Sequence, residues 1–182
     1  MAPANIPDNF VKRTPPGDER ERLVCEKCDF IHYDNPRIIV GAVCTWEGRY
    51  LMCKRAIAPR RGFWTLPAGF MEVGETAADG AAREAWEEAR VRLEIDGLLA
   101  VYDVLHVGQV QLIYRARLAT PDYAAGTESL EVDLYDWDRI PWDELAFPTV
   151  RWALQAHREL GDRPLAAPFT NPPDDLGGSP PD

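Results

Sequence analysis

The sequence predicts a single domain of the α/β (α+β) class, in which a mixed β-sheet is packed between a few helices. Runs of strand-forming residues outnumber helical patterns along the 182-residue chain. Two of these runs, IIVGAVCTW and YLMCKRA, flank Glu47–Gly48, which is a typical hairpin turn signal. Because strands dominate and several are joined as hairpins, the expected sheet is mixed and its faces are covered by the helices.

Each element is expected from its local pattern. The two strands of the hairpin are followed by a loop that contains Gly and Pro, and a helix follows that loop. Gly108 separates two later strand-like runs. The expected elements are strands over residues 38–46 and 50–56, a helix over 77–90, strands over 97–107, 110–118 and 131–140, and a helix over 149–160.

Composition shifts divide the chain into four segments. Both ends are rich in Pro and charged residues, which favours extended or mobile chain. The predicted segments are a flexible N-terminal arm over residues 1–21, a short zinc-ribbon-like remnant over 22–36, the main globular domain over 37–163 and a Pro-rich C-terminal tail over 164–182.

The charge balance excludes some classes of protein. A net charge of -10 argues against nonspecific nucleic-acid binding, because the phosphate backbone attracts clustered Lys and Arg. No apolar run is long enough to span a membrane, and the first residues lack the apolar core of a signal peptide. We therefore expect a cytoplasmic protein whose four cysteines are reduced thiols or metal ligands.

The helix expected over residues 77–90 carries an unusual acidic cluster. Glu84, Glu87 and Glu88 stand at i, i+3 and i+4, so they project from one face, where like charges repel. A solvated acidic face is the ordinary interpretation of such a pattern. The alternative is a site for Mg²⁺ or Mn²⁺, because carboxylate oxygens are the ligands that these cations prefer.

The loop in front of this helix favours the metal site. Gly69 is followed by five residues and then by Glu75. Seven further residues separate Glu75 from the run REAWEE, which begins at Arg83. This spacing resembles the Nudix box, the signature of hydrolases that cleave nucleoside diphosphates linked to another moiety. One position departs from the family pattern, because Arg90 stands where the family usually has a Gly that ends the helix in a left-handed turn. A non-Gly residue in that turn is disfavoured by about 1 kcal/mol.

The resemblance implies the Nudix fold, a mixed sheet between helices, and a set of roles. In that family the residues matching Glu84, Glu87 and Glu88 hold divalent metals, together with the carbonyl that matches Ala68. Arg83 is similar to the residue that braces the helix against the loop through a glutamate, here Glu75. The general base of the family lies either in the box or on a later loop. The first candidates are the box residues Glu84 and Glu87, and the candidates outside the box, ranked below them, are Glu128 and Glu131.

The resemblance extends to a branch of zinc-ribbon-bearing Nudix proteins related to plant FAD and ADP-ribose pyrophosphatases. It covers roughly residues 22–160 and implies a nucleotide-diphosphate substrate such as ADP-ribose or FAD. Arg55, Arg60 and Arg61 are natural clamps for pyrophosphate oxygens, although surface solubility is an alternative role for some of them. Trp64 is a candidate for stacking on a base, and core packing is its alternative.

Cys25 and Cys28 form one CxxC knuckle of a zinc ribbon. A structural zinc ion requires four ligands, and the first knuckle of the related proteins is absent from this chain. His32 is the nearest further ligand, so a metal-free remnant is expected and Zn²⁺ is not.

Two rival functions follow from the same features. A ligand-sensing Nudix domain would bind nucleotides without cleaving them, but the complete glutamate set favours catalysis. A nucleic-acid-binding zinc-ribbon protein is disfavoured by the acidic charge and the missing knuckle. Many relatives in this family are homodimers, which makes a homodimer a possible assembly.

Overall fold

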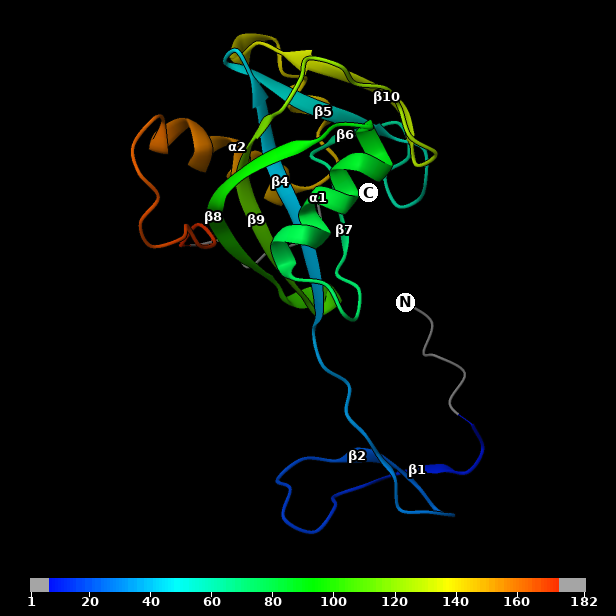
Figure 1. Cartoon of the computed structure of the whole chain (residues 1–182). Helices are drawn as coiled ribbons and strands as arrows, with labels where there is room; N and C mark the ends of the chain where they lie inside the picture. Colours follow the sequence, from blue (N-terminus) through cyan, green and yellow to red (C-terminus); the bar gives the residue numbers. More distant parts are fainter. Residues whose placement is uncertain (1–6, 174–182) are drawn as a thin grey trace. The chain divides into compact units, whose positions relative to one another are not determined.

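The computed structural model describes residues 7–173 and divides the chain into two units, one up to Asn35 and one from Pro36 onward (Figure 1). Each unit has its own β-sheet. The smaller sheet consists of β1 (Phe10–Arg13), β2 (Arg22–Cys25) and β3 (Ile31–His32). The larger sheet consists of β4 (Arg37–Trp46), β5 (Arg49–Arg55), β6 (Trp64–Thr65), β7 (Ala68–Phe70), β8 (Leu93–Val104), β9 (Gln109–Leu118) and β10 (Ser129–Tyr135).

The first unit corrects the expected N-terminal arm. β1 lies inside the segment expected to be flexible, and it pairs antiparallel with β2 over four residues. Two contacts between distant residues hold the unit together: the Phe10 and Phe30 rings meet edge to face at 6.4 Å, and Arg13 forms an ion pair with Asp29. Local composition alone does not reveal such contacts, which explains the difference.

The larger sheet has the mixed topology that the sequence predicts. Its main strand order is β10-β5-β4-β9-β8, and the short strands β6 and β7 pair with β5 and β4. Only β4 and β9 run parallel, whereas the other pairs are antiparallel. Glu47 and Gly48 both adopt positive φ, at 48° and 78°, which is the conformation that a tight hairpin turn between β4 and β5 requires.

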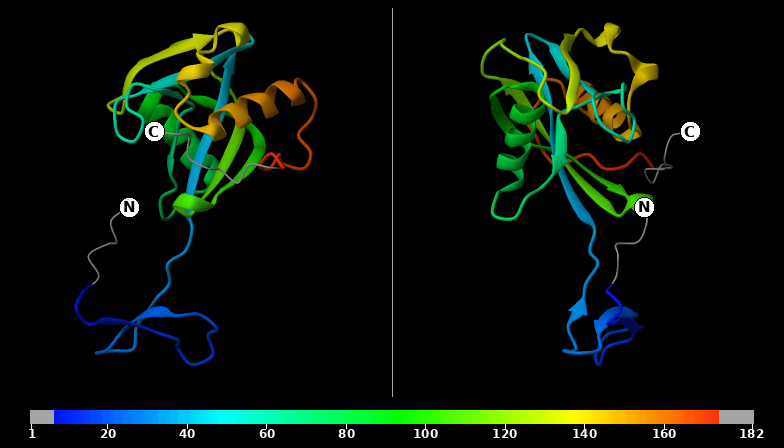
Figure 2. Two further views of the ribbon diagram at one scale, coloured as in Figure 1. Left: turned by 180° about the vertical axis from the view of Figure 1, so that it is seen from behind. Right: turned by 90° about the vertical axis from the view of Figure 1, so that its right-hand side faces the viewer.

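Two helices cover opposite faces of this sheet, α1 (Ala77–Ala89) and α2 (Pro148–Leu160) (Figure 2). Successive residues of a strand point to opposite faces, and β4 shows this alternation. Ala42 packs in a core cluster with Ala85 of α1, while Val43 packs in the other cluster with Leu154 of α2. The expected arrangement of a mixed sheet between helices is therefore confirmed.

The ends of α1 follow from its caps. The Thr76 side chain accepts a hydrogen bond from the Asp79 backbone N–H at 3.1 Å and starts the helix. Arg90 ends it in the left-handed conformation at φ 57°, where its N–H donates to the Trp86 carbonyl. The non-Gly residue at this position therefore keeps the turn that Gly usually makes, with its side chain lying over the Trp86 ring.

Several boundaries differ from expectation because they depend on contacts between distant segments. β8 begins at Leu93, four residues earlier than expected, and residues 105–107 form a 3₁₀ turn instead of strand. The described part of the tail also continues the fold: Phe169 bonds through its backbone to Leu99 and Val101 of β8, at 2.9 and 2.8 Å. Residues 174–182 of the expected tail lie outside the described residues.

Within residues 7–173, no helix combines the length and the apolar character that crossing a membrane requires.

Candidate active site

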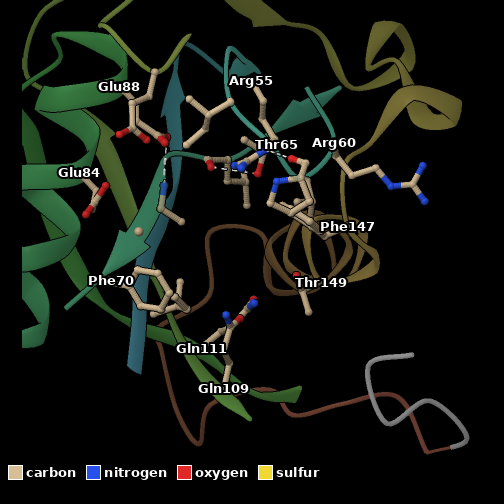
Figure 3. A pocket seen from close by; sticks show the side chains of 18 of the residues that line it. Arg55, Arg60, Thr65, Phe70, Glu84, Glu88, Gln109, Gln111, Phe147 and Thr149 are labelled. Atoms are coloured by element: carbon tan, nitrogen blue, oxygen red, sulfur yellow. Dashed lines mark hydrogen bonds between the residues drawn. The ribbon is translucent and has the colours of Figure 1, made fainter. Parts of the chain in front are cut away.

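A cavity of about 850 Å³ opens between the loop before α1, the start of α2 and the strands β4 and β9 (Figure 3). The residues that line it come from segments far apart in the sequence. Its charged lining includes Arg55, Arg60, Arg83, Glu84, Glu87, Glu88 and Glu128, and its other lining includes Ala68, Gly69, Phe70, Gln109, Gln111, Phe147 and Thr149. Most residues of the expected site therefore meet in one place.

The three helix glutamates differ in exposure, so they do not form the uniformly solvated acidic face that is the ordinary interpretation of their spacing. Glu84 and Glu88 are 9% and 6% exposed, whereas Glu87 is exposed to solvent. Residues four apart lie above one another on a helix, so Glu84 and Glu88 share the inward-facing side. Gly69 makes room for them, because a Cβ at that position would lie 2.4 Å from the Glu84 carboxylate.

Burial changes the protonation of the inward glutamates. Burial raises the pKa of Glu88 to about 8, although a hydrogen bond from the Ala68 N–H to its Oε2 at 3.2 Å acts in the opposite direction. Burial also raises the pKa of Glu84, and Arg83 partly offsets this rise. Ionising both carboxylates in this wall is thus unfavourable until a positive charge approaches them.

Arg83 ties the helix to the loop in front of it. Its guanidinium donates to both carboxylate oxygens of Glu75, at 2.9 and 3.0 Å, and to the Phe70 carbonyl at 3.0 Å. It also pairs with Glu84 at 2.8 Å and with Glu87 at 3.0 Å. Hydrogen bonds from Arg83 hold the pKa of Glu75 at about 2. The structure thus pairs the two residues that the resemblance assigns to the loop brace.

The donor set fits a hard divalent cation by charge and chemistry. Three carboxylates and the Ala68 backbone lie together, and two of those carboxylates are buried with raised pKa values. Within residues 7–173, no three His, Cys, Asp or Glu side chains already converge on one point. Arg83 instead links Glu84 to Glu87. Each of these ion pairs uses one oxygen of its carboxylate, so the other oxygen can still face a cation.

The loop before β10 is held against the end of α1. Gly126 donates its N–H to the Glu88 carbonyl at 2.9 Å, and Ala124 donates to the Ala89 carbonyl at 3.0 Å. A Cβ on Gly126 would lie 1.7 Å from the Glu87 carbonyl oxygen, so only Gly permits this approach. The carbonyl of Glu128 also accepts a hydrogen bond from the Ala56 N–H at 2.8 Å. The loop therefore fixes Glu128 at the cavity wall.

The structure separates the two candidate bases on this segment. Glu128 lines the cavity. Glu131 does not line it, and its side chain pairs with Lys54 at 3.6 Å on strand β10. A bulge in the pairing of β10 with β5 lies between Ser129 and Glu131.

Of the four expected substrate-binding residues, two line the cavity and two do not. Arg55 is partly buried in the cavity, where its guanidinium lies 5.2 Å from the centre of the Phe147 ring. Burial lowers the pKa of Arg55, and Glu88 and Glu128 raise it. Arg60 lines the cavity as well, with its guanidinium over the Phe63 ring.

Arg61 and Trp64 lie elsewhere. Arg61 is exposed and does not line the cavity. Trp64 is 3% exposed and packs edge to face on Tyr135 at 5.1 Å, inside the core, so its expected role in stacking on a base is not supported. Trp64 belongs to the core cluster that also contains Leu154 of α2, and a linear sequence does not display which face of a two-residue strand is covered.

Sequence reasoning missed a second group of lining residues, formed by Phe70, Gln109, Gln111 and Thr149. Gln109 and Gln111 alternate with apolar residues at the start of β9, so one face of that strand is polar. That alternation was the available signal. The sequence does not say which surface the polar face meets.

The cysteine knuckle belongs to the first unit. Cys25 is buried and Cys28 is exposed, and Asn9 donates a hydrogen bond to the Cys25 Sγ at 3.0 Å. Cys44 and Cys53 are buried in the sheet, as expected of small apolar residues. The absence of zinc stays a prediction.

Two family models match this chain. The model described as NUDIX domain matches residues 35–159, and the model described as Nudix N-terminal matches residues 9–34. The second match includes the knuckle and strand β1.

Three known proteins illustrate the similarity. A NUDIX hydrolase from Nitrosomonas europaea is 46% identical, with a TM-score of 0.83 over 89% of this chain and 93% of its own. A MutT-like protein from Streptomyces ambofaciens is 35% identical over 56% of this chain and 64% of its own. An ADP-ribose pyrophosphatase from Methanocaldococcus jannaschii is 28% identical over 63% of this chain and 69% of its own. The chain thus matches about two thirds of the length of each of these last two proteins.

Proposed function

This chain belongs to the Nudix hydrolase family, and we propose that it is a Mg²⁺- or Mn²⁺-dependent pyrophosphohydrolase that cleaves the diphosphate of an ADP-containing dinucleotide such as ADP-ribose or FAD. One observation carries the proposal. Glu84 and Glu88 are buried in the wall of a large cavity with raised pKa values, and arginines line the same cavity. Buried carboxylates beside arginines suit a cation together with an anionic substrate.

The protein's own residues divide the remaining work. A divalent cation held by Glu84, Glu87, Glu88 and the Ala68 carbonyl would screen the pyrophosphate charge and polarise its oxygens. Arg55 and Arg60 line the same cavity, and their planar donor forks would bind phosphate oxygens. Arg83 keeps the loop and the helix glutamates in place through its bonds to Glu75 and Glu84.

Glu128 is the proposed general base. It lies in the cavity wall, whereas Glu131 is paired with Lys54 outside it. As a carboxylate, Glu128 accepts a proton from the water that attacks phosphorus. Glu84 and Glu87, the box candidates for this role, are both paired with Arg83, so we assign them to holding the cation and not to proton transfer.

The test is a substrate panel with identified products. Purified protein is incubated with ADP-ribose, FAD and a nucleoside triphosphate, each with Mg²⁺ or Mn²⁺, in ¹⁸O-labelled water. We expect AMP plus ribose 5-phosphate from ADP-ribose, and AMP plus FMN from FAD. The label should enter a phosphate, because water attacks phosphorus. Release of inorganic phosphate, or label at a sugar carbon, would contradict the proposal, and binding without cleavage would favour the nucleotide sensor.

Two further expectations stay predictions: a cytoplasmic location and assembly as a homodimer.

A further inference from the structure

The cavity continues along the sheet away from the glutamates. Residues that pair across β7, β4 and β9 form successive rows in this direction. Gly41 of β4 pairs with Ala68 on one side and with Ile113 on the other. Two residues earlier, Ile39 pairs with Phe70 and with Gln111. Directly paired residues share a face of the sheet, and successive rows on one face lie about 7 Å apart. Phe70 and Gln111 therefore stand one row away from Ala68.

Gln109 stands one row farther again, paired with Arg37. Its side chain lies beside that of Gln111 in the cavity, across from Glu84 and Glu88 (Figure 3). We call the surface formed by Phe70, Gln109 and Gln111 the glutamine end of the cavity. We call the surface formed by Glu84, Glu87 and Glu88 the glutamate end. Gln111 and Gln109 stand one and two rows, about 7 and 14 Å, from the row of Ala68 at the glutamate end.

The glutamine end has the groups that recognise a flat polar ring. Both carboxamides present a donor and an acceptor, and both residues are only partly exposed. Among residues 7–173, no hydrogen bond reaches either carboxamide. These donors and acceptors are therefore available to a ligand.

Phe70 adds a stacking surface. Half of its surface is exposed, and the Arg37 guanidinium lies over its ring at 5.1 Å. Its carbonyl accepts a hydrogen bond from Arg83, so the backbone of Phe70 is held in register with the glutamate end. An aromatic ring with a cation over it and exposed area remaining is suited to stack on a nucleobase.

We propose that the glutamine end is the nucleobase subsite of this cavity and that it selects adenine, with the base stacked on Phe70 and its edge bonded to Gln111 and Gln109. This proposal rests on the proposed function, because it assumes that the glutamate end binds the phosphates. A carboxamide matches the neighbouring donor and acceptor of adenine, whereas the corresponding edge of guanine presents two acceptors that match Arg or Lys. Arg37, the cation that contacts Phe70, lies over its ring and donates to the Val107 carbonyl.

The test measures binding of AMP and IMP by calorimetry, because neither monophosphate carries the diphosphate that is cleaved. In IMP an oxygen replaces the adenine amino group, so the hydrogen bond from that amino group to the carboxamide oxygen is lost. The unaltered protein should bind AMP roughly tenfold more tightly than IMP, the size expected of one bidentate pair. Gln111→Met, which keeps the side-chain length, should remove this preference. Phe70→Ala should weaken both ligands together.

Gln155→Met is the matched control, because Gln155 is exposed on α2 and does not line the cavity. It should leave both affinities unchanged, and ribose 5-phosphate should bind equally to all variants. Should Gln111→Met fail to fold, Gln109→Met carries the same expectation. Equal affinity for AMP and IMP in the unaltered protein, or an unchanged preference in the folded glutamine variants, would overturn the subsite. A normal AMP preference without diphosphate cleavage would instead overturn the proposed function and leave the subsite standing.

Discussion

The two ends of the cavity are built in different ways. The glutamate end comes from one helix, α1, and its three residues lie within five positions of the sequence. The glutamine end comes from β7 and β9, which are brought together only because both pair with β4. The first end is therefore specified by local spacing and helix periodicity, whereas the second depends on the register of three strands. Residues at the first end are expected to govern the chemical step, and those at the second the choice of substrate.

Glu88→Gln should show the largest effect on the glutamate end. The change removes a buried carboxylate from the expected cation site while keeping its size, so kcat should fall about a thousandfold or more. Steady-state kinetics with ADP-ribose and varied Mg²⁺ would measure it. Glu94→Gln makes the same change at an exposed position of β8 and should have no effect. Near-normal activity with unchanged metal dependence would remove Glu88 from the site.

Gly126→Ala should produce the next largest loss. The new methyl group would collide with the Glu87 carbonyl, so the loop must move away from α1 and carry Glu128 with it. We expect kcat to fall about a hundredfold with a smaller change in KM, and Glu128→Gln to reproduce this. Ala125→Ser, at the exposed neighbouring position, is the control. A rise in KM alone would show that the loop serves binding and not proton transfer.

Arg55 in the cavity and Arg61 outside it offer a matched pair. Arg55→Ala removes a partly buried cavity guanidinium, so KM should rise about tenfold to a hundredfold. Arg61→Ala removes an exposed guanidinium outside the cavity and should leave KM unchanged. Initial rates over a range of ADP-ribose concentrations would separate the two. Equal effects from both variants would mean that general surface charge, and not a clamp, attracts the substrate.

The smallest expected effect concerns stability in the absence of metal. Glu88 keeps its proton up to about pH 8 in the folded protein, whereas its ordinary pKa is 4.5. Between these values the folded state binds more protons than the unfolded state, so the free energy of unfolding should fall as pH rises. From pH 6 to pH 8 this loss should reach up to about 2 kcal/mol, or several degrees in melting temperature.

Thermal melting with a chelator present would measure this slope. Glu88→Gln should flatten it, because the amide does not titrate. An equally steep slope in that variant would assign the pH dependence to other groups.

The sequence predicts features that depend on neighbouring residues, and it does not predict those that depend on contacts between distant segments. The hairpin at Glu47–Gly48 and the start of α1 at Thr76 were predictable, because turn and cap chemistry act over a few residues. The box glutamates and Arg83 were found through spacing for the same reason. The burial of Trp64 and the placement of Gln111 follow from strand register, which is decided by the packing of the whole sheet.

The pairing of Phe169 with β8 also determines how this sheet meets other molecules. β8 is the outermost strand on its side, and such a strand offers open N–H and C=O groups to which a foreign strand can add. Phe169 occupies these groups at Leu99 and Val101, and the Asn171 side chain occupies those at Asp103. The segment that contains Phe169 and Asn171 therefore covers part of the β8 edge, and we expect an insertion between α2 and Phe169 to leave these backbone groups open to pairing with another strand.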